Sequence, residues 1–209
     1  MSNLEEQLDQ CGKPTSERGA KLVKSMNKSH YSLTSWGLEK INIAAEDLIL
    51  DIGCGGGRTV ARLAEIATRG KVYGIDHSQD CVSWSVQFNQ KAVDEGRVSI
   101  IHSGVEKMPF DNHYFDLVVA VETIYFWPDI LACFEEVRRV LNSNGRFLII
   151  NEMYLSEAFR ERNEECMATG KMIIYSPGTL RDLLKKAGFS AISIDVVEEK
   201  NWLCCLSSK

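Results

Sequence analysis

The chain has 209 residues, of which 44% are hydrophobic and 25% charged, and its formal net charge is −5. This composition is that of an ordinary globular protein with enough length to bury a core. Because affinity for nucleic acid rests mainly on clustered Lys and Arg, the acidic balance argues against DNA or RNA as a partner and favours a small molecule.

The seven cysteines lack the CxxC or Cys/His spacing of a structural zinc site, and the sequence predicts no metal site. Reduced thiols are the simplest interpretation and are typical of the cytosol. The first residues lack the basic start and apolar run of a signal peptide, and no segment has the roughly 18 consecutive apolar residues of a membrane span. We therefore expect a cytoplasmic protein without a membrane span.

Short apolar runs alternate with amphipathic segments through most of the chain. The runs predict strands at residues 48–52, 71–76, 98–102, 115–121 and 146–150. A helix carrying Ile130 and Leu141, and then a turn at residues 142–145, precede the last of these strands. Because right-handed crossovers return each strand to the same direction, this alternation predicts an α/β fold with a mainly parallel sheet and helices on both faces.

The pattern changes near the end of the chain. Ser176 and Pro177 begin a last helix, which Gly188 ends. Two extended segments follow at residues 191–197 and 202–206, too close together for an intervening helix. They predict an antiparallel hairpin at the edge of the sheet.

Two regions lie outside the regular alternation. Residues 1–45 predict a helical leader, and residues 154–175 predict a lid-like insertion within a domain formed by residues 46–209. Because ligands of open α/β sheets bind beyond the carboxyl ends of the strands, both regions are placed to cover a site there.

A glycine-rich turn follows the first strand, with the sequence Asp51-Ile52-Gly53-Cys54-Gly55-Gly56-Gly57. We expect Gly53 and Gly55 to let the backbone bend sharply and approach a ligand without an intervening Cβ. A dinucleotide-binding turn would place a third glycine at position 58, where this chain has Arg58. The departure weighs against a nucleotide-dependent oxidoreductase.

Asp76 ends the second strand, 23 residues after Gly53. A carboxylate at this point can accept hydrogen bonds from both hydroxyls of a ribose, which indicates a nucleoside ligand. The blander interpretation is that Asp51 caps the turn and Asp76 caps the following helix.

Five segments, in order, resemble the motifs of class I S-adenosylmethionine-dependent methyltransferases, and are closest to the small-molecule enzymes related to ubiquinone and menaquinone biosynthesis. These segments are residues 51–57, 72–78, 104–110, 115–120 and 139–147. The resemblance implies a Rossmann-like, doubly wound, seven-stranded sheet that ends in an antiparallel hairpin. It also implies S-adenosylmethionine as the cofactor and S-adenosylhomocysteine as its product.

Residue by residue, the resemblance implies separate sites for the parts of the cofactor. The methionine part would be surrounded by Asp51, Gly53 and Gly55, with Arg58 or Thr59 assisting its carboxylate. The ribose would be held by Asp76 and flanked by His77 and Ser78, and the adenine would be bordered by Val105 and Glu106. The sulfonium and amino group would be faced by Val121 and Glu122.

Three polar side chains, two of them named above and one in the leader, are each compatible with more than one role. Glu122 is compatible with binding the amino group, with acting as a base, or with capping the helix that follows. Arg58 is compatible with a carboxylate ligand or with a solvated helix residue. His30, in the leader, is a candidate base, although a lone histidine is more often structural.

Aromatic side chains flank the expected acceptor side. Three of them directly follow the fourth strand, one follows the fifth strand and one lies in the leader; these are Tyr125, Phe126, Trp127, Tyr154 and Tyr31. Aromatic surface serves equally to bind an apolar ligand and to fill a core. We expect at least one of the three that follow the fourth strand to line a substrate pocket.

These features predict a methyltransferase that acts by direct displacement on a small-molecule acceptor. Such a reaction requires mainly that the nucleophile, the methyl carbon and the leaving sulfur be aligned and that water be excluded. A general base is needed only if the acceptor arrives protonated. The alternatives are a non-catalytic sensor or regulatory protein that binds the same cofactor and, less favoured, the nucleotide-dependent oxidoreductase.

Overall fold

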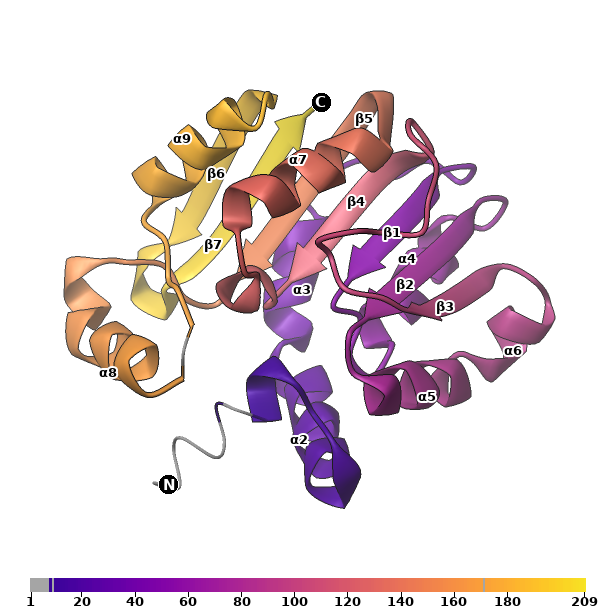
Figure 1. The fold of residues 1–209 in the computed structure, drawn as a ribbon, viewed down its shortest axis with the longest axis horizontal. Helices are drawn as coiled ribbons and strands as arrows, with labels where there is room; N and C mark the ends of the chain where they lie inside the picture. Colours follow the sequence, from indigo (N-terminus) through magenta and orange to yellow (C-terminus); the bar gives the residue numbers. More distant parts are fainter. Residues whose placement is uncertain (1–7, 9, 171) are drawn as a thin grey trace.

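The computed structural model describes residue 8, residues 10–170 and residues 172–209. Its centre is a seven-stranded sheet with the strand order β3-β2-β1-β4-β5-β7-β6 (Figure 1). The strands are β1 (Leu48–Ile52), β2 (Lys71–Asp76), β3 (Val98–His102), β4 (Phe115–Val121), β5 (Leu141–Asn151), β6 (Ser190–Val197) and β7 (Trp202–Ser208). The pairs among β1 to β5 are parallel, and β7 runs antiparallel to β5 and β6. The predicted fold class is confirmed, including the terminal hairpin.

The start of β5 differs from the prediction. The strand begins at Leu141, which pairs with Phe115, and the register then shifts so that Leu117 pairs with Arg146. Residues 142–145 are therefore an irregularity within the strand and not a separate turn. Leu141 is fully buried with an extended backbone, so it starts the strand and does not end the preceding helix.

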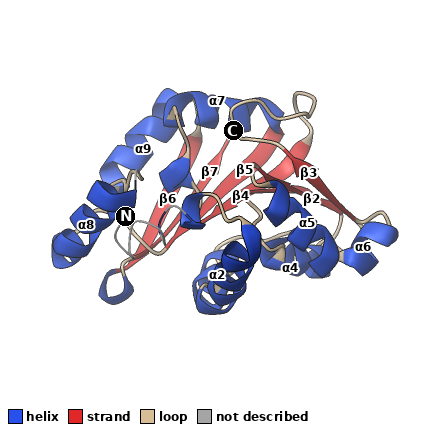
Figure 2. Cartoon of the chain, turned by 60° about the horizontal axis from the view of Figure 1, so that its bottom comes forward, coloured by secondary structure: helices blue, strands red, loops and turns tan. Residues whose placement is uncertain are grey.

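Helices cover both faces of the sheet (Figure 2). Those described are α2 (Ser16–Ser29), α3 (Tyr31–Leu38), α4 (Arg58–Ile66), α5 (Gln79–Phe88), α6 (Gln90–Asp94), α7 (Ile130–Val140), α8 (Arg160–Gly170) and α9 (Pro177–Lys186). A short 3₁₀ turn, η1 (Ile124–Phe126), follows β4. None of the described helices is long and apolar enough to cross a membrane.

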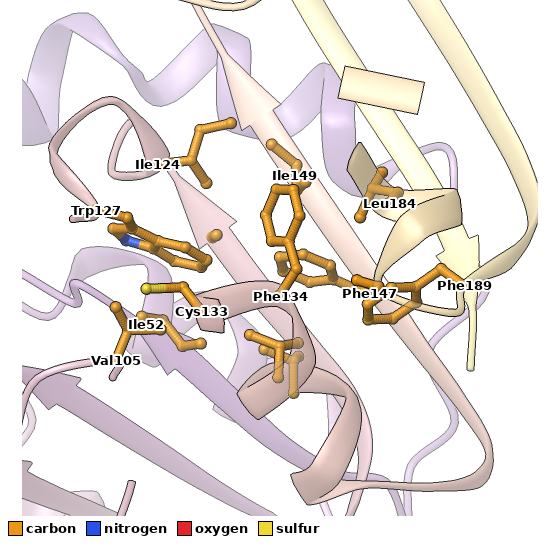
Figure 3. Close-up of a cluster of buried hydrophobic side chains, with 14 of the residues drawn as sticks. Ile52, Val105, Ile124, Trp127, Cys133, Phe134, Phe147, Ile149, Leu184 and Phe189 are labelled. Atoms are coloured by element: carbon orange, nitrogen blue, oxygen red, sulfur yellow. The ribbon is translucent and has the colours of Figure 1, made fainter. Parts of the chain in front are cut away.

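Each face of the sheet has its own apolar core. One core packs α7 and α9 against the sheet and contains the rings of Trp127, Phe134, Phe147 and Phe189 (Figure 3). The other packs α3 and α4 against the opposite face. Burial of these apolar side chains accounts for most of the favourable free energy of folding. Their close packing fixes the positions at which the strands end.

The leader packs beside the carboxyl ends of the parallel strands. In Figure 1, α2 lies at the lower edge of the molecule, toward which the arrowheads of β1 and β4 point. Two hydrogen bonds tie the beginning of α2 and the residue Pro14 before it to the beginning of α5. Ser78 Oγ, at the N-cap of α5, donates to the carbonyl of Pro14 (2.5 Å), and the amide of Ser16 donates to Asp80 Oδ2 (2.7 Å). The first seven residues of the predicted leader lie outside the described residues.

Candidate functional site

A cavity of about 440 Å³ lies at the carboxyl ends of β1, β2 and β4. Its walls come from the glycine-rich turn, from the ends of these strands, from the loop after β3 and from leader residues between Cys11 and Thr34. Among the described residues, none of those from 154 to 175 lines it. The leader, and not the 154–175 segment, therefore encloses the cavity in this structure.

The cavity brings together most of the residues that the sequence singled out. Those lining it are Asp51, Gly53, Gly55, Arg58, Thr59, Asp76, His77, Val105, Glu106, Val121, Glu122, Phe126, Trp127, His30 and Tyr31. The exceptions are Ser78, Tyr125 and Tyr154. One continuous surface thus contains side chains that lie almost a hundred positions apart in sequence.

The glycine-rich turn has backbone conformations that favour glycine. Gly53 and Gly55 have positive φ angles of 71° and 49°. A Cβ at Gly53 would lie 2.5 Å from Thr123 Oγ1, whereas a Cβ at Gly55 would meet no protein atom within 4 Å. The backbone at Gly55 therefore faces open space in the cavity wall, as expected where a ligand approaches the main chain closely.

Asp51 is a buried carboxyl group with an unsatisfied oxygen. Its side chain is 1% exposed, and its Oδ2 has no hydrogen-bond partner. Burial, with a smaller contribution from the negative charge of Asp76, raises the pKa of Asp51 from 3.8 to about 8. A buried acceptor without a partner on a cavity wall is suited to a donor or a cation on a ligand.

Asp76 is held by the turn that it faces. Its Oδ2 accepts a hydrogen bond from the amide of Gly55 (2.9 Å), and its Oδ1 accepts one from the amide of Ser78 (2.8 Å). The cap of α5 is Ser78, whose hydroxyl accepts from the amide of Cys81. Since Ser78 is fully buried and bonded to the leader, it lies behind the cavity wall and not on it.

Glu122 lies at the end of β4 with a left-handed backbone, at φ 58°. Its Oε1 accepts hydrogen bonds from the amide of Glu152 and from the hydroxyl of Tyr125 (3.4 Å). Burial and the nearby charge of Glu152 raise the pKa of Glu122 well above its usual range. Burial also lowers the pKa of His30, against the opposing effect of Glu152, so its imidazole is neutral near pH 7.

Glu152 is the polar residue of this region that sequence reasoning passed over. Its Oε2 lies 3.6 Å from Nε2 of His30. The signal was present in the sequence, because Glu122 and Glu152 each follow a parallel strand and those strands are neighbours in the sheet. Arg62 was also missed: it lines the cavity and lies 4.6 Å from the ring of Tyr31, beside Arg58 at 5.5 Å.

The structure separates the expected aromatic residues into two groups. Phe126 and Trp127 reach the cavity, and the indole of Trp127 donates to Thr123 Oγ1 (3.1 Å). Tyr125 and Tyr154 belong to apolar clusters and do not line the cavity, whereas Trp127, which is also a core residue at 6% exposure, lies at the boundary between core and cavity. Tyr125, in the 3₁₀ turn η1, is not part of the cavity lining, and its hydroxyl donates to the carbonyl of Met153 (3.2 Å).

Comparison with known proteins finds a likeness over the central part of the chain. Residues 50–149 match the family model described as "Methyltransferase domain". Over 164 residues the chain is 27% identical to a sterol 24-C-methyltransferase of Kluyveromyces lactis, which covers 73% of this chain and 43% of that protein. Over 106 residues it is 30% identical to a 2-phytyl-1,4-naphtoquinone methyltransferase of Trichormus variabilis. This match covers 50% of this chain and 46% of that protein. The chain spans about half the length of the first curated relatives that it matches.

Solved structures show the same fold over the whole chain. One is a chain in the complex between the Haloferax volcanii Trm112 methyltransferase activator and the putative methyltransferase. It superposes with a TM-score of 0.81 at 17% sequence identity and covers 100% of this chain and 98% of that chain. At this identity the likeness concerns the fold alone.

Proposed function

We propose that this chain, whose residues 50–149 match a methyltransferase domain, is a class I S-adenosylmethionine-dependent methyltransferase that transfers the methyl group of that cofactor to a small-molecule acceptor. The observation that carries the proposal is that the glycine-rich turn, Asp51 and Asp76 line one cavity at the carboxyl ends of the parallel strands. Ligands of open α/β sheets bind at this edge.

The residues present fit the cofactor. Asp51 offers an unsatisfied, buried oxygen for the ammonium of the methionine part, and Gly55 leaves room for the ligand to approach the backbone. We assign Arg58 and Thr59 to the carboxylate, Asp76 and His77 to the ribose, and Val105 and Glu106 to the adenine. In this arrangement Val121 and Glu122 face the sulfonium, because they end the strand beside β1.

When bound, the cofactor supplies an electrophilic methyl group. The chain contributes alignment of the acceptor and exclusion of water, for which a leader packed over the cavity is well suited. Phe126 and Trp127 offer apolar surface to an acceptor. Glu122 and His30 are the groups placed to take a proton from an acceptor that arrives protonated, because His30 is neutral near pH 7 and both line the cavity.

The cysteines and the net charge of the chain support two further proposals, on its compartment and on its acceptor. We propose that the protein works in the cytoplasm, which its cysteines support, since all seven are unpaired. A small-molecule acceptor, and not nucleic acid, is favoured by the net charge of −5.

The function is tested by separating cofactor binding from catalysis. Calorimetry with S-adenosylmethionine, S-adenosylhomocysteine and NAD is expected to show binding of the first two only. A labelled-methyl assay on fractionated small metabolites is then expected to yield a labelled product. Binding of NAD alone would contradict the cofactor assignment, whereas cofactor binding without any labelled product would favour a sensor.

The ribose assignment predicts the effect of Asp76→Ala. Its removal leaves ribose hydroxyls without their acceptor, so affinity for S-adenosylhomocysteine should fall by about 1–3 kcal/mol. Calorimetry measures the change, and thermal unfolding reports the part that comes from freeing the amides of Gly55 and Ser78. Asp94→Ala, at an exposed carboxylate on α6, is the matched control and should bind normally. Unchanged affinity in Asp76→Ala would remove the assignment.

A further inference from the structure

Three potential ligands for a metal ion meet where the leader faces the ends of β4 and β5. One donor atom each from His30, Glu122 and Glu152 lies within 4.8 Å of the others. His30 joins α2 to α3, Glu122 directly follows β4, and Glu152 directly follows β5. We call these residues the HEE cluster.

The backbone holds the HEE cluster in place. The amide of Glu122 donates to the carbonyl of Ile150 (2.9 Å), which fixes the end of β4 against β5. Glu122 Oε1 is held by the amide of Glu152 and by the hydroxyl of Tyr125. The carbonyl of His30 accepts from both the amide and the hydroxyl of Thr34 (2.9 Å each). The ligands are therefore positioned before any ion arrives, which lowers the cost of binding one.

The separation between His30 and Glu152 suits a shared cation better than a direct bond. The distance of 3.6 Å between Nε2 and Oε2 is too long for a hydrogen bond. Ligand bonds of about 2.0–2.2 Å place neighbouring donors around a tetrahedral ion about 3.3–3.5 Å apart. Because the three donor atoms lie within 4.8 Å of one another, they would need to draw together by up to about 1.5 Å to reach that spacing.

The charges of the HEE cluster also favour a cation. Two carboxyl groups and an imidazole, each partly buried, lie together where the leader faces the ends of β4 and β5. An imidazole nitrogen offers a metal ion a lone pair, and the carboxylates offer negative charge. A divalent ion would neutralise both carboxylates.

We propose that His30, Glu122 and Glu152 bind a single Zn²⁺ ion, with a fourth coordination position open toward the cavity. One imidazole and two carboxylates form a donor set that Zn²⁺ accepts, and three protein ligands with an open position are typical of zinc sites that also hold water or a substrate. The open position can take an oxygen or nitrogen atom of a small molecule. The proposal does not rest on the methyltransferase activity, and with Zn²⁺ bound His30 and Glu122 act as ligands and no longer take the proton of an acceptor.

The test uses the full chain after treatment with a chelator. Calorimetry with Zn²⁺ and absorption spectra with Co²⁺ should each show one equivalent bound, with dissociation constants below about 10 µM. His30→Ala and Glu152→Gln should each weaken binding at least about tenfold, since each removes a ligand.

Two control variants separate the HEE cluster from other donors. His113→Ala removes an exposed imidazole that contacts Lys209 elsewhere on the surface, and it should bind Zn²⁺ normally. Cys11→Ser removes the nearby thiol, whose pKa is raised to about 11, chiefly by burial, and it should also bind normally. Loss of binding in either control with retention in His30→Ala would overturn the proposal.

Glu152→Gln is the deciding variant, because its side chain is 41% exposed and the change is not expected to disturb folding. Circular dichroism and thermal unfolding check that it is folded. Retained Zn²⁺ affinity in folded Glu152→Gln would overturn the proposal, as would failure of the wild-type chain to take up one equivalent at about 100 µM metal.

Discussion

Gly55→Val is expected to remove cofactor binding while the protein stays folded. Gly55 has φ 49°, and a Cβ there would meet no protein atom, so the added side chain would extend into the cavity. The strain of a left-handed β-branched residue should lower the free energy of unfolding by about 1–2 kcal/mol. Affinity for S-adenosylhomocysteine should fall more than about a thousandfold, or about 4 kcal/mol, because the side chain fills space that the ligand needs.

Gly96→Val is the matched control for Gly55→Val. Gly96 also has a positive φ, at 75°, and a Cβ there also meets nothing within 4 Å, but it lies outside the cavity. Both variants should lose a similar amount of stability in thermal unfolding, and only Gly55→Val should lose binding in calorimetry. Equal affinities in the two variants would show that the cofactor does not approach the turn at Gly55.

Asp51→Asn should weaken cofactor binding and stabilise the ligand-free protein at high pH. The carboxylate is the group assigned to the ligand ammonium, and loss of one member of a buried charge pair costs about 2–5 kcal/mol in affinity. The pKa of Asp51 is raised from 3.8 to about 8, so the folded protein holds a proton that the unfolded chain releases between those values. The free energy of unfolding therefore falls as pH rises from 3.8 to about 8.

The comparison between Asp51→Asn and the wild type isolates this one group from the others that titrate. Below pH 3.8 the two ligand-free proteins should unfold at similar temperatures, because Asp51 is then protonated in both the folded and the unfolded chain, and the variant should gain stability relative to the wild type as pH rises from there to about 8. At pH 8.5 the variant should unfold at the higher temperature, since it buries no charge at this position. A difference in unfolding temperature that stays constant with pH would contradict the raised pKa.

The sheet was predictable because its strands are short apolar runs whose burial on both faces requires that composition. The glycine-rich turn and Asp76 were predictable because they adjoin such runs. The bounds of β5 were not, because burial of Leu141 and its pairing with Phe115 depend on a distant strand. Local sequence cannot weigh a contact of that kind against a turn signal such as residues 142–145.

The segment that encloses the cavity was harder to predict than the glycine-rich turn. The leader and the 154–175 segment both lie outside the βα alternation, and only tertiary packing decides which of them reaches the cavity. Tyr125 and Trp127 are two positions apart and both pack in apolar clusters, but only Trp127 also lines the cavity. Their chemistry alone does not distinguish the two outcomes.

The bond between Ser78 and Pro14 has a consequence for turnover and for handling the protein. Because leader residues near position 14 wall the cavity, we expect exchange of product for fresh cofactor to depend on motion of that segment. Tethering the leader to a surface or a fusion partner would slow that exchange. The carboxyl end is the safer point of attachment, because β7 runs antiparallel to β5 and finishes at the opposite edge of the sheet from the cavity.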